Sequence, residues 1–189
     1  MKLAYSMSTG FVDFPGKYAA TIYLTGCNLR CPYCYNMQVV NGEPTLEYDD
    51  ILEYLFRMKK IFPKFYVVIS GGEPTINKDF EYVVEDLKRN NFKLGIHTNG
   101  IKLPKFENVF DGVILSLKSI SDGIPCMLKT QYYTIMKDAM KYYDKCDYRE
   151  IRVVDIENNN DWYNSMLNII KPEESGWLIR KVNNYLEGN

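Results

Sequence analysis

The sequence predicts an α/β protein whose strands form a partial (open) parallel β/α barrel of about five or six βα units. Short apolar segments alternate along the chain with segments of helical period. Such alternation is typical of parallel βαβ units. A closed barrel needs eight strands, and this chain carries too few. The unusual residues follow the ends of the predicted strands, where ligands bind in sheets of this kind.

Five strands are predicted from short apolar runs that end at turn residues. They span residues 19–25, 65–70, 93–98, 112–117 and 149–154. The segment 177–186 is ambiguous, because it fits either a sixth strand followed by a turn or a final helix.

Four helices are predicted between and after these strands. Thr45, Asn77 and Thr130 are expected to lie at the starts of the first three. The first helix is acidic in its early part and basic in its late part, as the helix dipole favours. Helical spacing predicts the inward-facing residues to be Tyr48, Ile51, Leu52, Leu55 and Phe56; Phe80, Val83, Val84 and Leu87; Ile135, Ala139, Met140 and Tyr143; and Trp162, Met166, Ile169 and Ile170.

Composition and charge exclude several classes of function. The chain has 23 Lys and Arg against 24 Asp and Glu, so it lacks the basic surplus of a dedicated nucleic-acid binder. With 46% apolar and 25% charged residues, it is a folded protein and not a disordered one. The sequence shows neither an apolar run long enough to cross a bilayer nor a signal-peptide pattern. We therefore expect a cytoplasmic protein with no membrane or nucleic-acid partner.

The cysteines are the most informative residues in the sequence. Cys27, Cys31 and Cys34 form a C-x3-C-x2-C loop after the first predicted strand. An odd total of five cysteines, without a secretion signal, argues against a disulfide framework. Three thiolates suit a [4Fe–4S] cluster with one open iron. A structural zinc ion is the alternative, but it needs a fourth ligand, which only the fold could bring close from His97, Cys126 or Cys146.

The cysteine loop, with Tyr33 before its last cysteine, resembles that of the radical S-adenosylmethionine superfamily. The second hallmark of that family, Gly-Gly-Glu-Pro after the second predicted strand, stands at residues 71–74. The resemblance implies that Cys27, Cys31 and Cys34 hold a [4Fe–4S] cluster whose open iron binds S-adenosylmethionine. It further implies that the reduced cluster cleaves this cofactor to methionine and a 5′-deoxyadenosyl radical.

Residues 8–17, which include the series Asp-Phe-Pro-Gly, and the aromatic–Asn pair after the third cysteine narrow the resemblance to the glycyl radical enzyme activases. The most similar subgroup activates anaerobic ribonucleoside-triphosphate reductases. The resemblance is good over residues 5–118 and poor after about residue 125, so we expect one domain over 1–189 with a core at about 18–155 and a divergent segment at 156–189. It implies an oxidoreductase of anaerobic cells that takes a hydrogen atom from a glycine of a partner such as anaerobic ribonucleotide reductase. A flavodoxin or ferredoxin would donate the electron.

The resemblance also implies which residues contact S-adenosylmethionine, and no catalytic side chain is assigned because the cofactors carry the radical chemistry. The contacts are Tyr33, Gly71, Gly72, Glu73, Pro74, Thr98, Asn99, Ser116, Lys118 and Arg152. His97 and Ser116 replace acidic residues that help hold a monovalent cation in some activases, and His97 is interpreted as a strand-end histidine with satisfied hydrogen bonds. Cys126 and Cys146 are interpreted as ordinary thiols. Lys17 and Arg30 either lie near the cluster or are surface charges.

Two other functions stay open. A radical enzyme of the same superfamily could act on a peptide or on a small molecule such as a deazapurine precursor, since the second half of the chain diverges. A non-catalytic iron–sulfur or zinc module would serve electron transfer or scaffolding and would not cleave S-adenosylmethionine.

Overall fold

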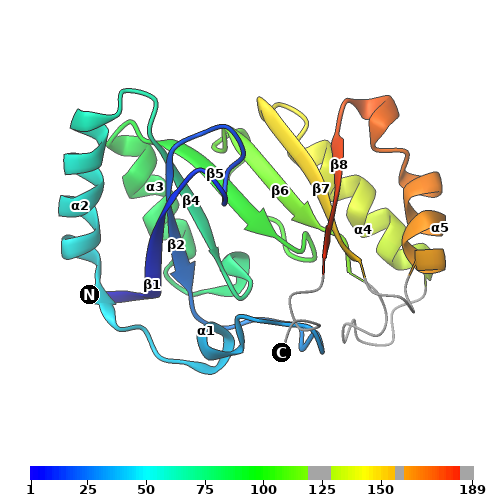
Figure 1. The fold of residues 1–189 in the computed structure, drawn as a ribbon, viewed down its shortest axis with the longest axis horizontal. Helices are drawn as coiled ribbons and strands as arrows, with labels where there is room; N and C mark the ends of the chain where they lie inside the picture. Colours follow the sequence, from blue (N-terminus) through cyan, green and yellow to red (C-terminus); the bar gives the residue numbers. More distant parts are fainter. Residues whose placement is uncertain (119–128, 156–159, 184–189) are drawn as a thin grey trace.

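The computed structural model describes residues 1–118, 129–155 and 160–183. Eight strands form one sheet in the order β3-β1-β2-β4-β5-β6-β7-β8, which stays open at both edges (Figure 1). Neighbours from β2 to β8 run parallel, whereas β1 runs antiparallel to both β2 and β3. The strands are β1 (Lys2–Gly10), β2 (Ala19–Leu24), β3 (Leu46–Glu47), β4 (Tyr66–Gly71), β5 (Lys93–Thr98), β6 (Gly112–Ser116), β7 (Tyr148–Asp155) and β8 (Leu178–Asn183).

The predicted open parallel barrel is confirmed, and so are its five strands. The ambiguous C-terminal segment contains β8, which pairs in parallel with β7. Helices follow β2, β4, β6 and β7, as βαβ connections favour, whereas residues 99–111 between β5 and β6 contain no helix. The helices are α1 (Met37–Asn41), α2 (Tyr48–Ile61), α3 (Phe80–Arg89), α4 (Lys129–Tyr142) and α5 (Asn160–Ile170).

The first strand of the sheet was not predicted, and its presence overturns one capping assignment. Strand β1 lies between β2 and the short β3. The Thr45 hydroxyl donates to the carbonyl of Tyr5 in β1 (2.7 Å) instead of capping a helix. Helix α2 begins three residues later, at Tyr48. Asn77 does act near a helix start, because its side-chain oxygen accepts the Asp79 amide (3.0 Å) just before α3.

The two faces of the sheet pack against different parts of the chain. One face packs against α2, α3, α4 and α5 and holds the main apolar core. The helix faces agree with the prediction except for Phe56 and Ile169, which are 39% exposed, and for the partly buried Leu52, Ile135 and Trp162. In the described residues, no helix is both long enough and apolar enough to cross a bilayer.

The other, concave face is closed at the amino end of the parallel strands by Phe14. This ring is fully buried and lies 5.2 Å from the ring of Tyr66 and 5.1 Å from that of Tyr148, between centroids. Gly112 makes room for it, since a Cβ atom there would come within 2.1 Å of the ring. The segment between β1 and β2 therefore covers the concave face at the end of the sheet opposite the cysteine loop.

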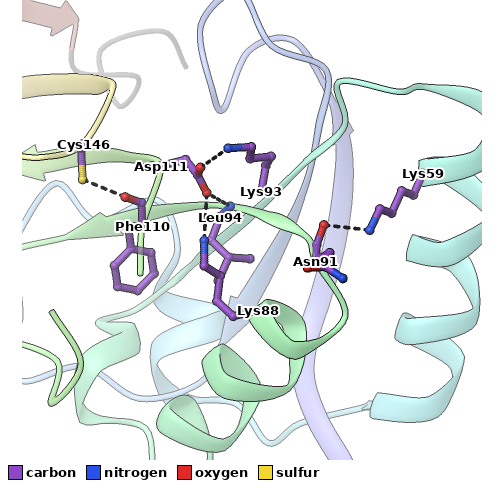
Figure 2. Close-up of polar contacts among 8 residues, drawn as sticks. All are labelled: Lys59, Lys88, Asn91, Lys93, Leu94, Phe110, Asp111 and Cys146. Carbon is purple, nitrogen blue, oxygen red and sulfur yellow. Dashed lines mark hydrogen bonds and ion pairs between the residues drawn. The ribbon is translucent and has the colours of Figure 1, made fainter. Parts of the chain in front are cut away.

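Asp111 joins several elements at this amino end (Figure 2). Its carboxylate pairs with the ammonium groups of Lys93 (2.6 Å) and Lys88 (3.3 Å) and accepts the Leu94 amide (2.9 Å). Burial alone would raise the pKa of Asp111, but these contacts outweigh it and lower the pKa below its usual range. Nearby, Lys59 of α2 donates to the Asn91 carbonyl (2.7 Å), so that α2 is tied to the turn before β5.

We expect Asp111→Asn to lower the free energy of unfolding at pH 7, because it removes both ion pairs. The loss should be only about 1–2 kcal/mol, because the two lysines are partly exposed and solvent screens the pairs. A carboxylate with a lowered pKa stabilises the fold above its unfolded-state pKa, and this contribution disappears as the pH falls through the folded-state pKa. Urea unfolding should therefore show a smaller difference at pH 3 than at pH 7. The exposed Asp138→Asn is the control. An equal loss at both pH values would contradict the assignment.

Candidate functional site

The three clustered cysteines lie where the parallel strands end, on the loop between β2 and α1 (Figure 1). All three are half-buried, and none forms a disulfide. The Cys34 amide donates to the Cys31 carbonyl (3.1 Å), and the Leu29 amide donates to Cys27 Sγ (3.4 Å). One compact loop therefore presents three thiols near the surface.

Of the two cations considered near this loop, only Arg30 lies beside it. The Arg30 guanidinium donates to the carbonyls of Cys27 (2.9 Å) and Leu29 (2.8 Å). The Lys17 ammonium lies 5.7 Å from the ring centroid of Tyr66, which begins β4 at the opposite end of the sheet. Lys17 is therefore remote from the cysteines.

The donor set fits an iron–sulfur cluster better than a single metal ion. Within the described ranges, no three His, Cys, Asp or Glu side chains gather as ligands of one ion would. A [4Fe–4S] cluster does not require this, because each thiolate binds a different iron. The pKa of the Cys27 thiol is raised, because burial and the Glu73 carboxylate outweigh the lowering effects of the Leu29 amide and the Lys118 ammonium. The loop thus offers three soft donors with a cation nearby.

The Gly-Gly segment packs directly against the start of the cysteine loop. The Gly72 amide donates to the Leu24 carbonyl (3.1 Å), and the Glu73 amide donates to the Gly26 carbonyl (2.9 Å). A Cβ atom at Gly71 or Gly72 would lie within 2.1 Å of the carbonyl oxygen of Leu24 or Gly26, and Gly71 has a φ of +126°. Only glycine fits this conformation and this close approach.

Glu73 ties together the exits of β4 and β5. Its side chain is almost fully buried. It accepts hydrogen bonds from the Thr75 amide (3.2 Å) and hydroxyl (2.7 Å), the Thr98 hydroxyl (2.7 Å) and the Asn99 amide (2.7 Å). Burial raises the pKa of Glu73, and the four hydrogen bonds oppose that rise. Because a carboxylate offers about four acceptor positions, this one is satisfied within the protein.

Asn99 connects the β5 exit to the cysteine loop itself. Its side-chain nitrogen donates to the Asn28 side-chain oxygen (2.8 Å), and its own oxygen accepts the Ile101 amide (3.0 Å). Asn28, which lies between the first two cysteines, was not predicted as a site residue. The sequence places Asn28 inside the C-x3-C motif, but this position alone does not predict its hydrogen bond with Asn99.

Lys118 brings the β6 exit to the same loop. Its ammonium lies 5.4 Å from the centroid of the Tyr33 ring, within the range of a cation–π contact. Its backbone is fixed from the other side, since its amide donates to the Tyr132 hydroxyl (2.8 Å) and its carbonyl accepts the Trp162 indole N–H (3.1 Å). Predicted site residues from the exits of β4, β5 and β6 are thus gathered around the cysteine loop, which itself follows β2.

His97 is a strand-end histidine with satisfied hydrogen bonds, as expected. Its Nε2–H donates to the Asp13 carbonyl (2.6 Å), which leaves Nδ1 as the acceptor for the Ser70 hydroxyl (3.4 Å). Burial and the nearby Arg152 guanidinium lower the pKa of His97 to about 4, so the imidazole is neutral at pH 7. Ser116 lies beside Arg152 in the β6–β7 register and is half-buried.

Arg152 lies on the concave face, where Glu150 binds its guanidinium through Nε (2.9 Å) and Nη2 (2.8 Å). Glu150 was not predicted, although Tyr148, Glu150 and Arg152 alternate along the strand and so share one face.

Cys126 lies outside the described residues. Cys146 is buried and donates to the Phe110 carbonyl (3.3 Å), as an ordinary thiol does. A cleft of about 510 Å³ lies between α4 and the end of α5, and none of the predicted site residues lines it.

Comparison with known proteins connects this site to a family. Residues 21–167 match the model of the radical SAM superfamily. A Methanocaldococcus jannaschii protein named as a glycyl-radical enzyme activating enzyme is 32% identical over 58% of this chain and 45% of its own length. The pyruvate formate-lyase-activating enzyme of Clostridium pasteurianum is 28% identical over 87% of this chain and 74% of its own. The 7-carboxy-7-deazaguanine synthase of Hyperthermus butylicus is 35% identical over 47% of this chain and 37% of its own.

Solved structures share the fold at low identity. SuiB of Streptococcus suis bound to its precursor peptide SuiA has a TM-score of 0.60 at 18% identity, over 87% of this chain and 38% of that chain. TYW1 with a lysine-pyruvate adduct has a TM-score of 0.56 at 16% identity, over 87% and 64%. The family match covers most of the chain and contains both the cysteine loop and the Gly-Gly-Glu-Pro segment. The chain therefore belongs to the radical SAM superfamily, and this membership implies a [4Fe–4S] cluster and S-adenosylmethionine as its cofactors.

Proposed function

We propose that this radical SAM enzyme generates a glycyl radical on a partner protein. The observation that carries the proposal is the similarity to a pyruvate formate-lyase-activating enzyme over 87% of the chain. The Methanocaldococcus jannaschii relatives named as glycyl-radical enzyme activating enzymes support it over shorter stretches. Residues 8–17 favour anaerobic ribonucleotide reductase as the partner.

In this proposal, Cys27, Cys31 and Cys34 hold the cluster, which supplies an electron that cleaves S-adenosylmethionine. The protein binds and orients the cofactor. The loop backbone at 71–74 is made rigid by the Glu73 hydrogen bonds and by its contact with the cysteine loop. The other proposed contacts are Tyr33, Thr98, Asn99, Ser116, Lys118 and Arg152. Because reductive cleavage needs a low potential, a flavodoxin or ferredoxin is the proposed electron donor, in anaerobic cells.

A radical reaction on a small molecule is the second candidate. Three relatives named 7-carboxy-7-deazaguanine synthase match 40% to 49% of this chain at 32% to 37% identity. They match a smaller share of the chain than the activating enzymes do, which is why the activase is preferred. A non-catalytic module is disfavoured, because it has no need of the Gly-Gly-Glu-Pro loop beside the thiols.

The experiment mixes the anaerobically reconstituted enzyme, S-adenosylmethionine and reduced flavodoxin with an anaerobic ribonucleotide reductase from the same organism. Electron paramagnetic resonance should detect a glycyl radical on the reductase, and the radical should be absent when its candidate glycine is replaced by alanine. If 5′-deoxyadenosine forms but no glycyl radical appears on this or any other glycyl radical enzyme of the organism, the activase proposal fails.

We expect Cys34→Ala to lose most of the cluster iron and all formation of 5′-deoxyadenosine, because a single loop supplies all three thiolates. Cys146→Ala is the matched control, since that thiol is buried far from the loop and should leave iron content unchanged. Iron per chain and the visible absorbance of the reconstituted protein measure the outcome. Full iron and full activity in Cys34→Ala would refute the ligand assignment.

We expect Glu73→Gln to lower the free energy of unfolding by about 2–4 kcal/mol, because an amide nitrogen would face donors inside a buried site. The same change should weaken S-adenosylmethionine binding about tenfold or more by loosening the loop at 71–74. Urea unfolding and equilibrium dialysis measure the two effects. Glu85→Gln, on the exposed side of α3, is the control. Wild-type stability in Glu73→Gln would show that the four hydrogen bonds do not brace the loops.

A further inference from the structure

The cleft between α4 and the end of α5, of about 510 Å³, has no role in the proposed function. Part of its lining comes from the turn just before β8, and β8 begins beside Glu150, near the start of β7. The cleft therefore lies toward the amino end of these strands, whereas the cysteine loop follows the carboxyl end of β2 (Figure 1). A molecule bound in the cleft would leave the candidate site open.

The floor of the cleft is apolar. Met140 of α4, Ile170 of α5 and Trp177 line it, and each is less than a tenth exposed. Ile169 also lines the cleft and is 39% exposed, although its helical spacing from the buried Met166 is that of an inward-facing residue. The cleft thus leaves apolar surface in water, and covering this surface would be favourable.

One wall of the cleft is a turn that is already fixed. The amides of Ser175 (3.0 Å) and Trp177 (2.9 Å) both donate to the Pro172 carbonyl. The Lys171 ammonium pairs with the Glu174 carboxylate across the same turn (2.9 Å). Because these contacts shape the wall in advance, a partner would not have to order it on binding.

The opposite wall, on α4, carries two exposed lysines four residues apart, Lys137 and Lys141. Among the described residues neither forms an ion pair, and like charges at this spacing repel each other. The helix dipole favours Lys141 in the last turn of α4, but it does not account for Lys137, which lies more than a turn before the end. Since Lys171 and Glu174 pair with each other, only Asp144 offsets these two cations in the cleft. The surplus positive charge favours an acidic partner.

We propose that the cleft between α4 and α5 docks an acidic amphipathic helix of a partner protein. A groove between two helices accepts the side-chain ridges of a third helix, and in this mode of recognition apolar anchors enter the groove. Carboxylates one turn apart on the docked helix would face Lys137 and Lys141. Its apolar side chains would cover Ile169 and the floor at Trp177. The docking site goes beyond the proposed function and does not depend on it.

The test follows the fluorescence anisotropy of a dye-labelled, alanine-based helical peptide of about 15 residues as the cluster-loaded enzyme is added. The peptide carries two glutamates four residues apart and leucines at helical spacing beside them. It should bind, and the double variant Lys137→Glu, Lys141→Glu should weaken binding about tenfold or more, because attraction becomes repulsion. Ile169→Asp should weaken binding about fivefold by placing a charge against the apolar side chains of the peptide. All three replaced side chains are at least partly exposed, so the fold should tolerate the changes.

The matched control is the double variant Lys60→Glu, Lys64→Glu, which changes the net charge equally at two exposed lysines remote from the cleft and should bind like wild type. A peptide with lysines in place of its glutamates should prefer the Lys137→Glu, Lys141→Glu protein to wild type. The proposal would be overturned by no binding of the acidic peptide at about 1 mM, or by an affinity of that double variant within about twofold of wild type.

Sedimentation of the enzyme alone examines the other occupant, a second copy of this chain. The enzyme should show no self-association through the cleft. A concentration-dependent dimer that the Lys137→Glu, Lys141→Glu variant cannot form would assign the cleft to a second copy and overturn the proposal. Neither S-adenosylmethionine cleavage nor glycyl radical formation enters these measurements, so their failure is separate from failure of the activase proposal.

Discussion

The carboxylate of Glu73 is the constraint on which the site depends. Its four hydrogen bonds join the turn after β4 to the turn after β5, in a place from which water is excluded. Once these exits are joined, Asn99 is positioned to reach Asn28 inside the cysteine loop. The backbone at Gly72 is pressed against Gly26 from the other side. The loop that carries the thiols is therefore held by two neighbouring strand exits and does not rely on its own short turns.

Contacts that stabilise the fold and residues of the candidate site lie at opposite ends of the parallel strands. At the amino end, Phe14 closes the concave face, and Asp111, just before β6, forms one ion pair with β5 and one with α3. At the carboxyl end lie the thiols, the glycine turn and Lys118. This division is usual in parallel β/α architectures, where changes at the carboxyl end alter the chemistry without disturbing the core. The concave face adds a third zone, in which β7 and β8 carry charged groups that face the interior of the half-barrel.

Much of this arrangement could be predicted from the sequence, because it follows from local signals. The five central strands are short segments rich in apolar residues that end at turn residues, and the cysteine spacing and the Gly-Gly-Glu-Pro series are recognisable without a structure. What was missed depends on contacts between distant segments. Strand β1 has only a weak alternation of apolar and polar residues, so the sequence does not predict it. Its pairing with β2 becomes visible only in the structure. Thr45 has the chemistry of a helix cap, yet the Tyr5 carbonyl competes for its hydroxyl. Glu150 and Arg180 are thirty residues apart and meet only because β8 pairs with β7.

The central claim is that the Cys27–Cys34 loop holds a redox-active cluster that cleaves S-adenosylmethionine. The most direct measurement is the yield of 5′-deoxyadenosine from protein reconstituted anaerobically with iron and sulfide, with and without a reductant. The account predicts product only in the reduced sample, together with a change in the electron paramagnetic resonance spectrum of the reduced cluster when S-adenosylmethionine is added. Zinc in freshly purified anaerobic protein, with no spectral change and no product after reconstitution, would contradict it.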